Sequence, residues 1–166
     1  MSLSELCRGC GLCCDGNLFS HVPLQPAEVG AARRNGLDVV ALADGAPAIR
    51  QCCTALKGRV CTVYAGRPEG CRRYACRLFN ALAGGTVSFQ EALAVVEQAH
   101  ALLSAVERSL GPGTDPSPSS VLERARFAAW GEDGGFSSET SAARERAEAF
   151  LDQHFHGGPR RFESPG

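Results

Sequence analysis

The clearest hydrophobic pattern in the chain lies in residues 88–110. Apolar side chains and one histidine recur there at the three- and four-residue spacing of a single helix face. These positions are Phe89, Leu93, Val96, His100 and Leu103. Ser88 and Glu91 form a capping-box pair at the start, and Gly111-Pro112 ends the pattern. The sequence therefore predicts a long amphipathic helix, within residues 84–110, that packs on the preceding part of the chain.

Two shorter helices are predicted after it, in a hairpin-like segment over residues 120–156. Ser120 and Glu123 form a second capping box, which opens a helix that runs to about Trp130. A further helix is expected over residues 138–155. The composition of residues 111–119, rich in Pro, Gly and Ser, predicts a flexible linker, and residues 157–166 are expected to form a disordered tail.

The pattern in residues 1–83 is shorter in range and more irregular. Residues 18–24 are expected to be extended, and a helix is expected from Pro26 to just before Gly36. The apolar or β-branched stretches 48–56 and 60–64 flank Lys57-Gly58, which predicts a short hairpin. The fold class is therefore α+β: a small irregular domain with a short β-hairpin and helices, followed by a mostly α-helical C-terminal region.

Cysteine is the residue that changes this picture. The chain has nine cysteines, all between Cys7 and Cys76. Disulfides require an oxidising compartment, whereas the N-terminal residues lack the basic start and apolar stretch of a signal peptide, so a cytoplasmic location is expected. The odd number would also leave one thiol unpaired. Metal thiolates are favoured over disulfides and over redox or catalytic thiols, and the metal is expected to hold the N-terminal domain together.

The first cysteine group has the spacing C-x2-C-x2-C-C, formed by Cys7, Cys10, Cys13 and Cys14. A tight turn through Gly9 and Gly11 would bring the sulfurs to one side, as a zinc ion or an iron–sulfur cluster requires. Adjacent side chains diverge, so Cys13 and Cys14 are not expected to bind one ion side by side. Two nearby centres or one polynuclear centre fit this spacing better. The alternative is that one of the pair is a small buried hydrophobic residue.

The second cysteine group extends from Cys52 to Cys76. A helix is expected to start with Pro68 in its first turn, and Cys71 and Cys76 would then lie on different faces of it. Either this helix breaks between them or the two cysteines bind at different centres. The group as a whole comprises Cys52, Cys53, Cys61, Cys71 and Cys76.

Charge is distributed unevenly along the chain. The net charge of −1 argues against a general nucleic-acid or membrane-surface binder. Residues 50–77 nevertheless carry +6, which would offset buried thiolates or form a basic face for an acidic protein partner. Residues 1–80 carry +4 and residues 81–166 carry −5. We therefore expect the acidic helical half to dock on the basic cysteine-rich half.

The two cysteine groups resemble the YkgJ-type cysteine-cluster family, described as a zinc- or iron-chelating domain. The first element is C-x2-C-G-x-C-C, and the second runs from Cys53 and Leu56 through Cys61, Tyr64, Arg67 and Pro68 to Cys71 and Arg72, with Cys76 following. The resemblance covers about residues 5–80. It implies zinc or iron, including an iron–sulfur cluster, bound by Cys7, Cys10, Cys13, Cys14, Cys53, Cys61, Cys71 and Cys76. Cys52 would be the spare cysteine.

The resemblance implies a cofactor class but no particular reaction. Flagellin lysine methylases share a similar cysteine motif, so an enzyme in redox chemistry or protein methylation is one alternative, and a metal carrier or store is another. The sequence contains no phosphate-binding glycine loop and no common hydrolase or metalloprotease motif. His21, seven residues after Cys14, is a weaker candidate ligand. The expected partners are metal ions and an unidentified protein, without nucleic acid or membrane; the oligomeric state is left open.

Overall fold

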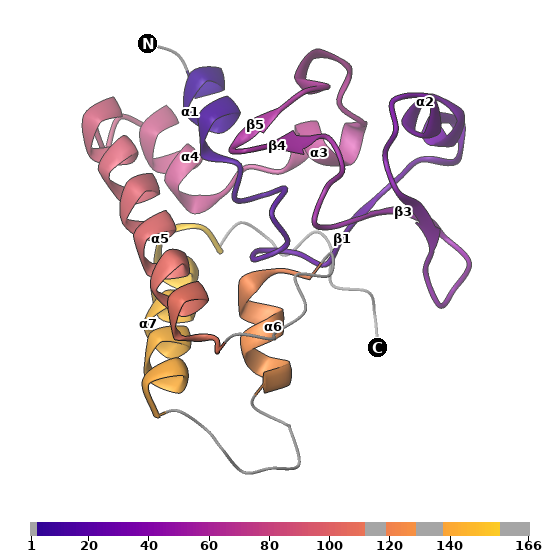
Figure 1. Ribbon diagram of the computed structural model, residues 1–166. Helices are drawn as coiled ribbons and strands as arrows, with labels where there is room; N and C mark the ends of the chain where they lie inside the picture. Colours follow the sequence, from indigo (N-terminus) through magenta and orange to yellow (C-terminus); the bar gives the residue numbers. More distant parts are fainter. Residues whose placement is uncertain (1–2, 112–118, 129–137, 157–166) are drawn as a thin grey trace.

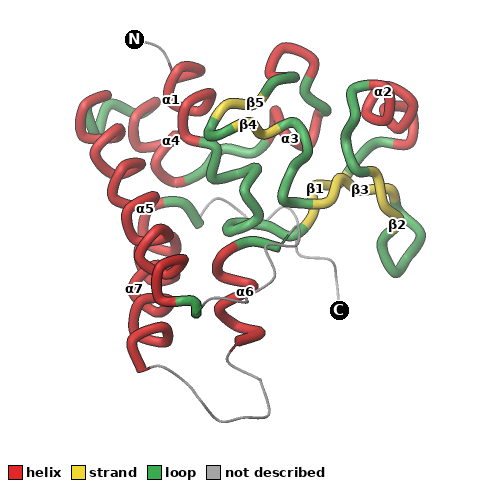
Figure 2. The backbone as a smooth tube through the Cα atoms, viewed as in Figure 1, coloured by secondary structure: helices red, strands yellow, loops and turns green. Residues whose placement is uncertain are grey.

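A computed structural model describes residues 3–111, 119–128 and 138–156 of the chain. Short helices and two small sheets make up the cysteine-rich N-terminal part, and longer helices make up the C-terminal part (Figures 1 and 2). This arrangement confirms the predicted α+β class. The predicted linker is outside the described residues except for its two ends, and the predicted tail and the end of a helix at Trp130 lie wholly outside them.

Three helices form the C-terminal region: α5 (Phe89–Ser109), α6 (Val121–Ala128) and α7 (Ser138–His154). The capping box of α5 is present, because Ser88 Oγ accepts from the Glu91 N–H at 3.2 Å and Glu91 Oε2 accepts from the Ser88 N–H at 2.7 Å. The long helix predicted here is therefore confirmed. Helices α5 and α7 lie side by side along most of their length (Figure 1). Within the described residues, none of the helices is long and apolar enough to cross a membrane.

The N-terminal part is built from short elements. Its main sheet has the order β1-β3-β2, with both pairs antiparallel, and Ile49 of β3 lies opposite Val22 and Val39. The sheet strands are β1 (His21–Pro23), β2 (Val39–Ala41) and β3 (Pro47–Arg50), and the separate hairpin pairs β4 (Leu56–Lys57) with β5 (Val60–Cys61). The helical elements are α1 (Leu3–Cys10), η1 (Pro26–Glu28), α2 (Val29–Arg34), η2 (Tyr64–Gly66), α3 (Glu69–Arg73) and α4 (Arg77–Ala83).

The predicted hairpin over residues 48–56 and 60–64 is correct only at its turn. Each strand of the hairpin is two residues long, with Gly58 and Arg59 between them, and β3 instead joins the three-stranded sheet. Beyond this strand, the Cys53 N–H donates to the Cys14 carbonyl at 2.8 Å. This bond draws the segment towards the first cysteine group. The helix predicted from Pro26 does form, as η1 followed by α2.

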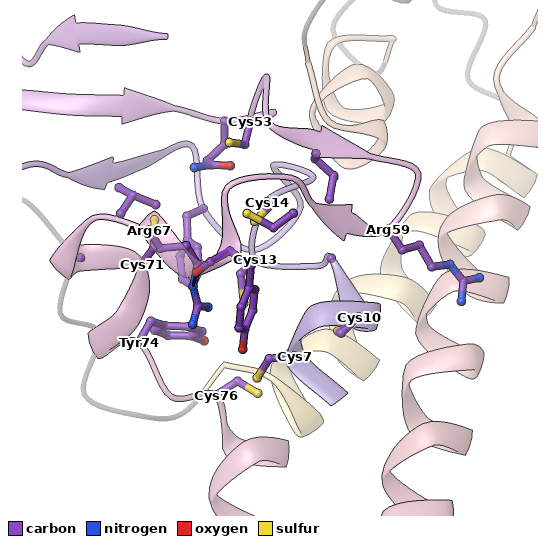
Figure 3. Close-up of a pocket in the computed structure, with 18 of the residues that line it drawn as sticks. Cys7, Cys10, Cys13, Cys14, Cys53, Arg59, Arg67, Cys71, Tyr74 and Cys76 are labelled. Atoms are coloured by element: carbon purple, nitrogen blue, oxygen red, sulfur yellow. Dashed lines mark hydrogen bonds between the residues drawn. The ribbon is translucent and has the colours of Figure 1, made fainter. Parts of the chain in front are cut away.

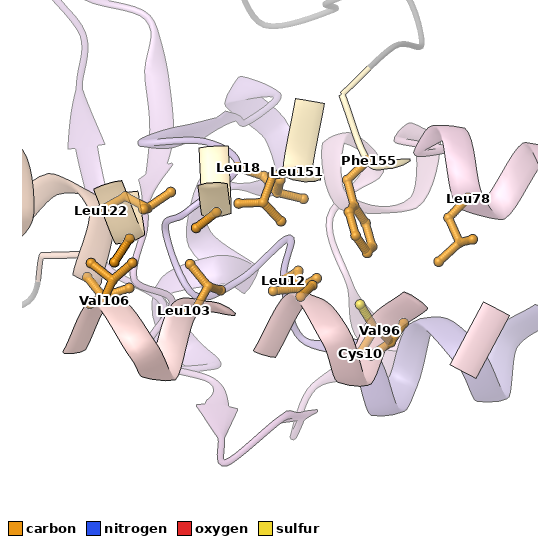
Figure 4. Close-up of a cluster of buried hydrophobic side chains, with 14 of the residues drawn as sticks. Cys10, Leu12, Leu18, Leu78, Val96, Leu103, Val106, Leu122, Leu151 and Phe155 are labelled. Atoms are coloured by element: carbon orange, nitrogen blue, oxygen red, sulfur yellow. The ribbon is translucent and has the colours of Figure 1, made fainter. Parts of the chain in front are cut away.

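Two hydrophobic cores hold the molecule together. The larger one joins α1, the loop after it and α4 to the C-terminal helices (Figure 4). Leu12, whose side chain has 0% exposure, lies in this core with Val96, Leu103 and Leu151. The smaller core lies around the three-stranded sheet and consists of Val22, Leu24, Ala32, Leu37, Ile49 and Ala55. The smaller core contains no aromatic side chain among its buried residues, so it has little apolar area to support it.

The helical half does pack on the cysteine-rich half, as the charge distribution predicted, but the contact is mainly apolar. Leu6, Leu12 and Leu18 are buried in the core that they share with the C-terminal helices. Arg59 and Glu97 form an ion pair across it at 2.5 Å, and both side chains are well exposed. Exposed ion pairs contribute little stability, so charge complementarity is a minor part of this docking.

Leu12 gives a direct test of this packing. Leu12→Ala should lower the free energy of unfolding by about 2–5 kcal/mol, because it removes a fully buried side chain between the two halves. Val60, which is 45% exposed, provides the control: Val60→Ala should change the free energy of unfolding by less than about 1 kcal/mol. Urea unfolding at a fixed metal content measures both. Equal effects of the two substitutions would contradict the packing described here.

Candidate metal centre

Cys7 and Cys10 lie one helical turn apart on α1, on the same face of the helix. The predicted tight turn through Gly9 is therefore wrong, since Gly9 lies within α1. Gly11 ends the helix with a φ of +73°, and a Cβ there would lie 2.8 Å from the Arg59 carbonyl oxygen. A glycine is required at this position on both grounds. The Cys14 N–H donates to the Gly11 carbonyl at 2.8 Å, so a turn places the next two cysteines directly beyond α1.

The second cysteine group reaches the same region from several short elements. Cys53 is held by its bond to the Cys14 carbonyl, and Cys61 lies in β5 opposite Leu56. Helix α3 ends at Arg73, so the predicted helix breaks between Cys71 and Cys76. Cys76 then caps α4, and its Sγ accepts from the Phe79 N–H at 3.3 Å. Burial raises the pKa of Cys76, and the hydrogen bonds from backbone N–H groups at the start of α4 offset part of this shift.

The electrostatic interactions divide eight cysteines into two groups. Burial raises the pKa of Cys10 to about 12, and the charges of Cys76 and Cys7 raise it as well; burial likewise raises the pKa of Cys13, with further contributions from Cys10 and Cys76. Group 1 is therefore Cys7, Cys10, Cys13 and Cys76. Cys14 and then Cys7 follow Cys10 and Cys76 among the causes of the raised pKa of Cys13, so the second group lies directly beside the first.

The second group is centred on Cys14. Burial raises its pKa to about 12, and the charges of Cys53, Cys61 and Cys71 follow as causes. Burial also raises the pKa of Cys71 to about 11, with contributions from Cys53 and Cys61. Group 2 is therefore Cys14, Cys53, Cys61 and Cys71. Each group takes cysteines from both halves of the sequence motif.

One cavity of about 90 Å³ connects the two groups (Figure 3). All eight cysteines of groups 1 and 2 line it. Cys52 is not among the lining residues; its Sγ donates instead to the Asp15 carbonyl at 2.8 Å. The structure thus brings together the eight cysteines that the resemblance implied as ligands and separates the ninth. Leu78, Val96 and Phe155 close the cavity from the side of the helices.

The thiols of both groups are free, and so is that of Cys52. In the part of the chain that the structure describes, no three His, Cys, Asp or Glu side chains already stand in a ligating arrangement. Eight sulfur donors on one cavity fit zinc or iron, which thiolates bind well.

Neither His21 nor His100 lines the cavity. His21 lies in β1 with its Nδ1 3.1 Å from Ser20 Oγ, and it does not line the cavity. His100, on the predicted buried face of α5, has its Nε2 2.7 Å from the Cys10 carbonyl oxygen. This bond ties the helix that carries Cys7 and Cys10 to the long helix behind it. His100 thus positions α1 without reaching the cavity.

Several non-cysteine residues of the site were not singled out as functional by the sequence. Tyr64, Arg67 and Tyr74 line the cavity, and the Tyr74 hydroxyl donates to the Phe155 carbonyl at 3.0 Å. Burial raises the pKa of Tyr74, so its hydroxyl keeps the proton that it donates. Gln51 also lines the cavity; it is 7% exposed, and its Oε1 has no hydrogen-bond partner among the described residues. In the sequence, the Y-x-x-R-P segment that contains Tyr64 and Arg67 could have pointed to two of these residues.

The family model CxxCxxCC, described as "Putative zinc- or iron-chelating domain", matches residues 6–94. This match covers more than half of the chain and includes both cysteine groups, so the protein belongs to this family. The family description supports metal binding and leaves the choice between zinc and iron open. No curated protein and no solved structure matches the chain.

The buried thiols make the stability of the metal-free protein depend on pH. Folding raises the pKa of Cys7 to about 11 and of Cys10 and Cys14 to about 12, from an ordinary value of 9.0. Above about pH 9 the unfolded chain loses protons that the folded chain keeps, so stability should fall steadily from about pH 9 towards pH 12. Urea unfolding of reduced, chelated protein between pH 7.5 and about 10.5 measures this. A free energy of unfolding that rises with pH over this range would contradict the burial of these thiols.

Proposed function

We propose that the protein binds two zinc or iron ions, one with each group of four cysteines, and that the metal is mainly structural. The observation that carries the proposal is that eight cysteines line one cavity, and the electrostatic interactions between neighbouring thiols favour two sets of four. Four thiolates satisfy the tetrahedral preference of a structural site. Group 1 would hold one ion and group 2 the other.

The chain path supports two centres rather than one. Cys13 and Cys14 are adjacent and diverge, and each interacts with a different group. Cys71 and Cys76 are likewise separated by the break between α3 and α4. The C-x2-C-x2-C run is also found at iron–sulfur clusters, so each group remains a candidate for iron as well as zinc. Elemental analysis of the purified protein decides between zinc and iron.

A structural role follows from the two unequal cores. The small core around the three-stranded sheet packs against Cys53 and Cys71 of group 2 and has few large apolar side chains of its own. Metal binding couples to folding where a domain buries too little apolar area to fold alone. The larger core around α5 and α7 contains no group 2 cysteine. Metal loss should therefore affect the two cores differently.

Serine substitutions test which cysteines are ligands. Cys10→Ser and Cys61→Ser should each remove about one of the two bound ions, because each breaks one group of four thiolates. Cys52→Ser is the matched control, since its neighbour Cys53 is a proposed ligand and Cys52 itself lies outside the cavity. Elemental analysis of anaerobically purified protein gives the number of ions per chain. Loss of metal from Cys52→Ser to the same extent would overturn the assignment.

Hydrogen exchange tests the structural role. After chelation, amide protection should be lost in β1–β3 and α2 and kept in α5 and α7, because only the former depend on the small core. Exchange followed by mass spectrometry resolves these segments. Restored protection on adding zinc would serve as the control for irreversible damage. Native protection of β3 in the chelated protein would end the structural interpretation.

A thiolate-metal or iron–sulfur enzyme, in redox chemistry or protein methylation, is the second candidate function. The unpartnered Oε1 of Gln51 favours it, since a buried amide oxygen beside a sulfur-lined cavity can accept a hydrogen bond from a small molecule. Colourless protein with stoichiometric zinc supports the structural role, and brown anaerobic protein that bleaches in air supports the enzyme. Rapid loss of metal to a weak chelator would instead indicate a carrier or store.

A further inference from the structure

Arg67 is held in a fixed position at the edge of the cavity. Its guanidinium carbon lies 3.5 Å from the centroid of the Tyr64 ring, and its Nε donates to the Tyr64 carbonyl at 3.0 Å. Tyr64 is in turn anchored, because its hydroxyl donates to the Ser4 carbonyl of α1 at 3.3 Å. Stacking and hydrogen bonding together leave the cation little freedom to turn towards solvent.

Both cysteine groups interact with this cation. The charge of Arg67 lowers the pKa of Cys7, in group 1, and of Cys71, in group 2, against the larger effect of burial. Figure 3 shows the Arg67 side chain extending into the cavity from the side of Cys71 towards Cys7 and Cys76. Arg67 therefore lies close to members of both groups, although it is only four residues from Cys71 and sixty from Cys7 in sequence.

Other cations of this segment have carboxylate partners. Arg59 also lines the cavity but pairs with Glu97, whereas Arg50 pairs with Asp38 and Arg73 with Glu69. Arg72, on the exposed side of α3, does not line the cavity. Among the described cations of residues 50–77, Arg67 is the one whose charge acts on members of both groups.

Two centres of four thiolates place a large negative charge in a small volume. A divalent ion with four thiolates carries −2, so two such centres carry −4, and buried charge is unfavourable unless it is offset. A fixed guanidinium near both centres offsets each of them.

We propose that Arg67 is a shared counter-charge that raises the metal affinity of both centres. This inference rests on the proposed function, because it requires two occupied thiolate centres. It makes Arg67 a positioning and charge-balancing residue that is not itself a ligand. A residue that served only the adjacent segment would affect group 2 alone, whereas a shared counter-charge must also affect group 1.

The test uses single-centre backgrounds so that the two effects are separated. Cys10→Ser reports on group 2, and Cys61→Ser reports on group 1. Arg67→Met in each background should lower zinc affinity by about 10–100-fold, the range that loss of a second layer of interactions around a metal produces. Anaerobic titration of zinc against a chromophoric chelator measures the affinity in both cases. In the otherwise unchanged chain, both stepwise constants should fall by a similar factor.

Conservative variants separate charge from structure. Arg67→Lys keeps the charge and should retain affinity within a few-fold of the wild type, whereas Arg67→Gln keeps an N–H donor for the Tyr64 carbonyl and should lose as much as Arg67→Met. Arg72→Met, an equal change of charge outside the cavity, should leave both affinities unchanged. If Arg67→Met does not fold, Arg67→Gln carries the same comparison.

The outcomes distinguish this inference from the proposed function. The shared counter-charge is overturned if Arg67→Met lowers zinc affinity at only one centre or at neither. It is also overturned if Arg67→Lys lowers the affinity as much as Arg67→Met does. Each of these results leaves the two-centre proposal intact. If the wild type binds no zinc or iron, or binds it without the cysteines of groups 1 and 2, the proposed function fails and this inference fails with it.

Discussion

One peptide bond joins the two groups of thiols, because Cys13 and Cys14 are neighbours whose side chains serve different groups. The turn closed by the Cys14 N–H and the Gly11 carbonyl fixes this pair at the end of α1. The Cys14 carbonyl then accepts from the Cys53 N–H and brings the second cysteine segment to the same place. The rest of the N-terminal half depends on this junction, since the sheet, the hairpin and α3 are all arranged around it.

The C-terminal helices give this junction a dry, apolar support. Leu12, between the two group 1 cysteines Cys10 and Cys13, is buried against α5, and Phe155 reaches the cavity from the end of α7. Burial raises the pKa of Cys10 and Cys14 and keeps their thiols protonated until a cation competes for them. A metal that binds must therefore displace protons, and the bound thiolates are then shielded from water by the same side chains.

Much of the architecture was predictable because its signals are local. The capping box at Ser88 and Glu91 and the repeat of apolar residues define α5 without reference to the rest of the molecule. The strands β1 and β2 are only three residues long, and pairing across the sheet rather than local pattern stabilises them, so the three-stranded sheet was missed. Helix α1 was missed because its glycine at position 9 and its cysteines are typical of turns.

The cysteines were recognisable from their spacing, but their grouping was not. Spacing shows that Cys13 and Cys14 diverge, yet it does not say which distant cysteine each one meets. Cys76 joins group 1 only because the chain turns after Arg73 and α4 packs against α1. The stack of Arg67 on Tyr64 likewise depends on a tertiary contact, between the Tyr64 hydroxyl and Ser4 in α1.

X-ray absorption at the metal edge, combined with a metal count, tests the central claim most directly. Anaerobically purified protein should contain two ions of zinc or iron per chain, each surrounded by sulfur, at about 2.3 Å if the metal is zinc. A shell of nitrogen and oxygen, or a metal-free protein whose cysteines are paired as disulfides, would contradict the account.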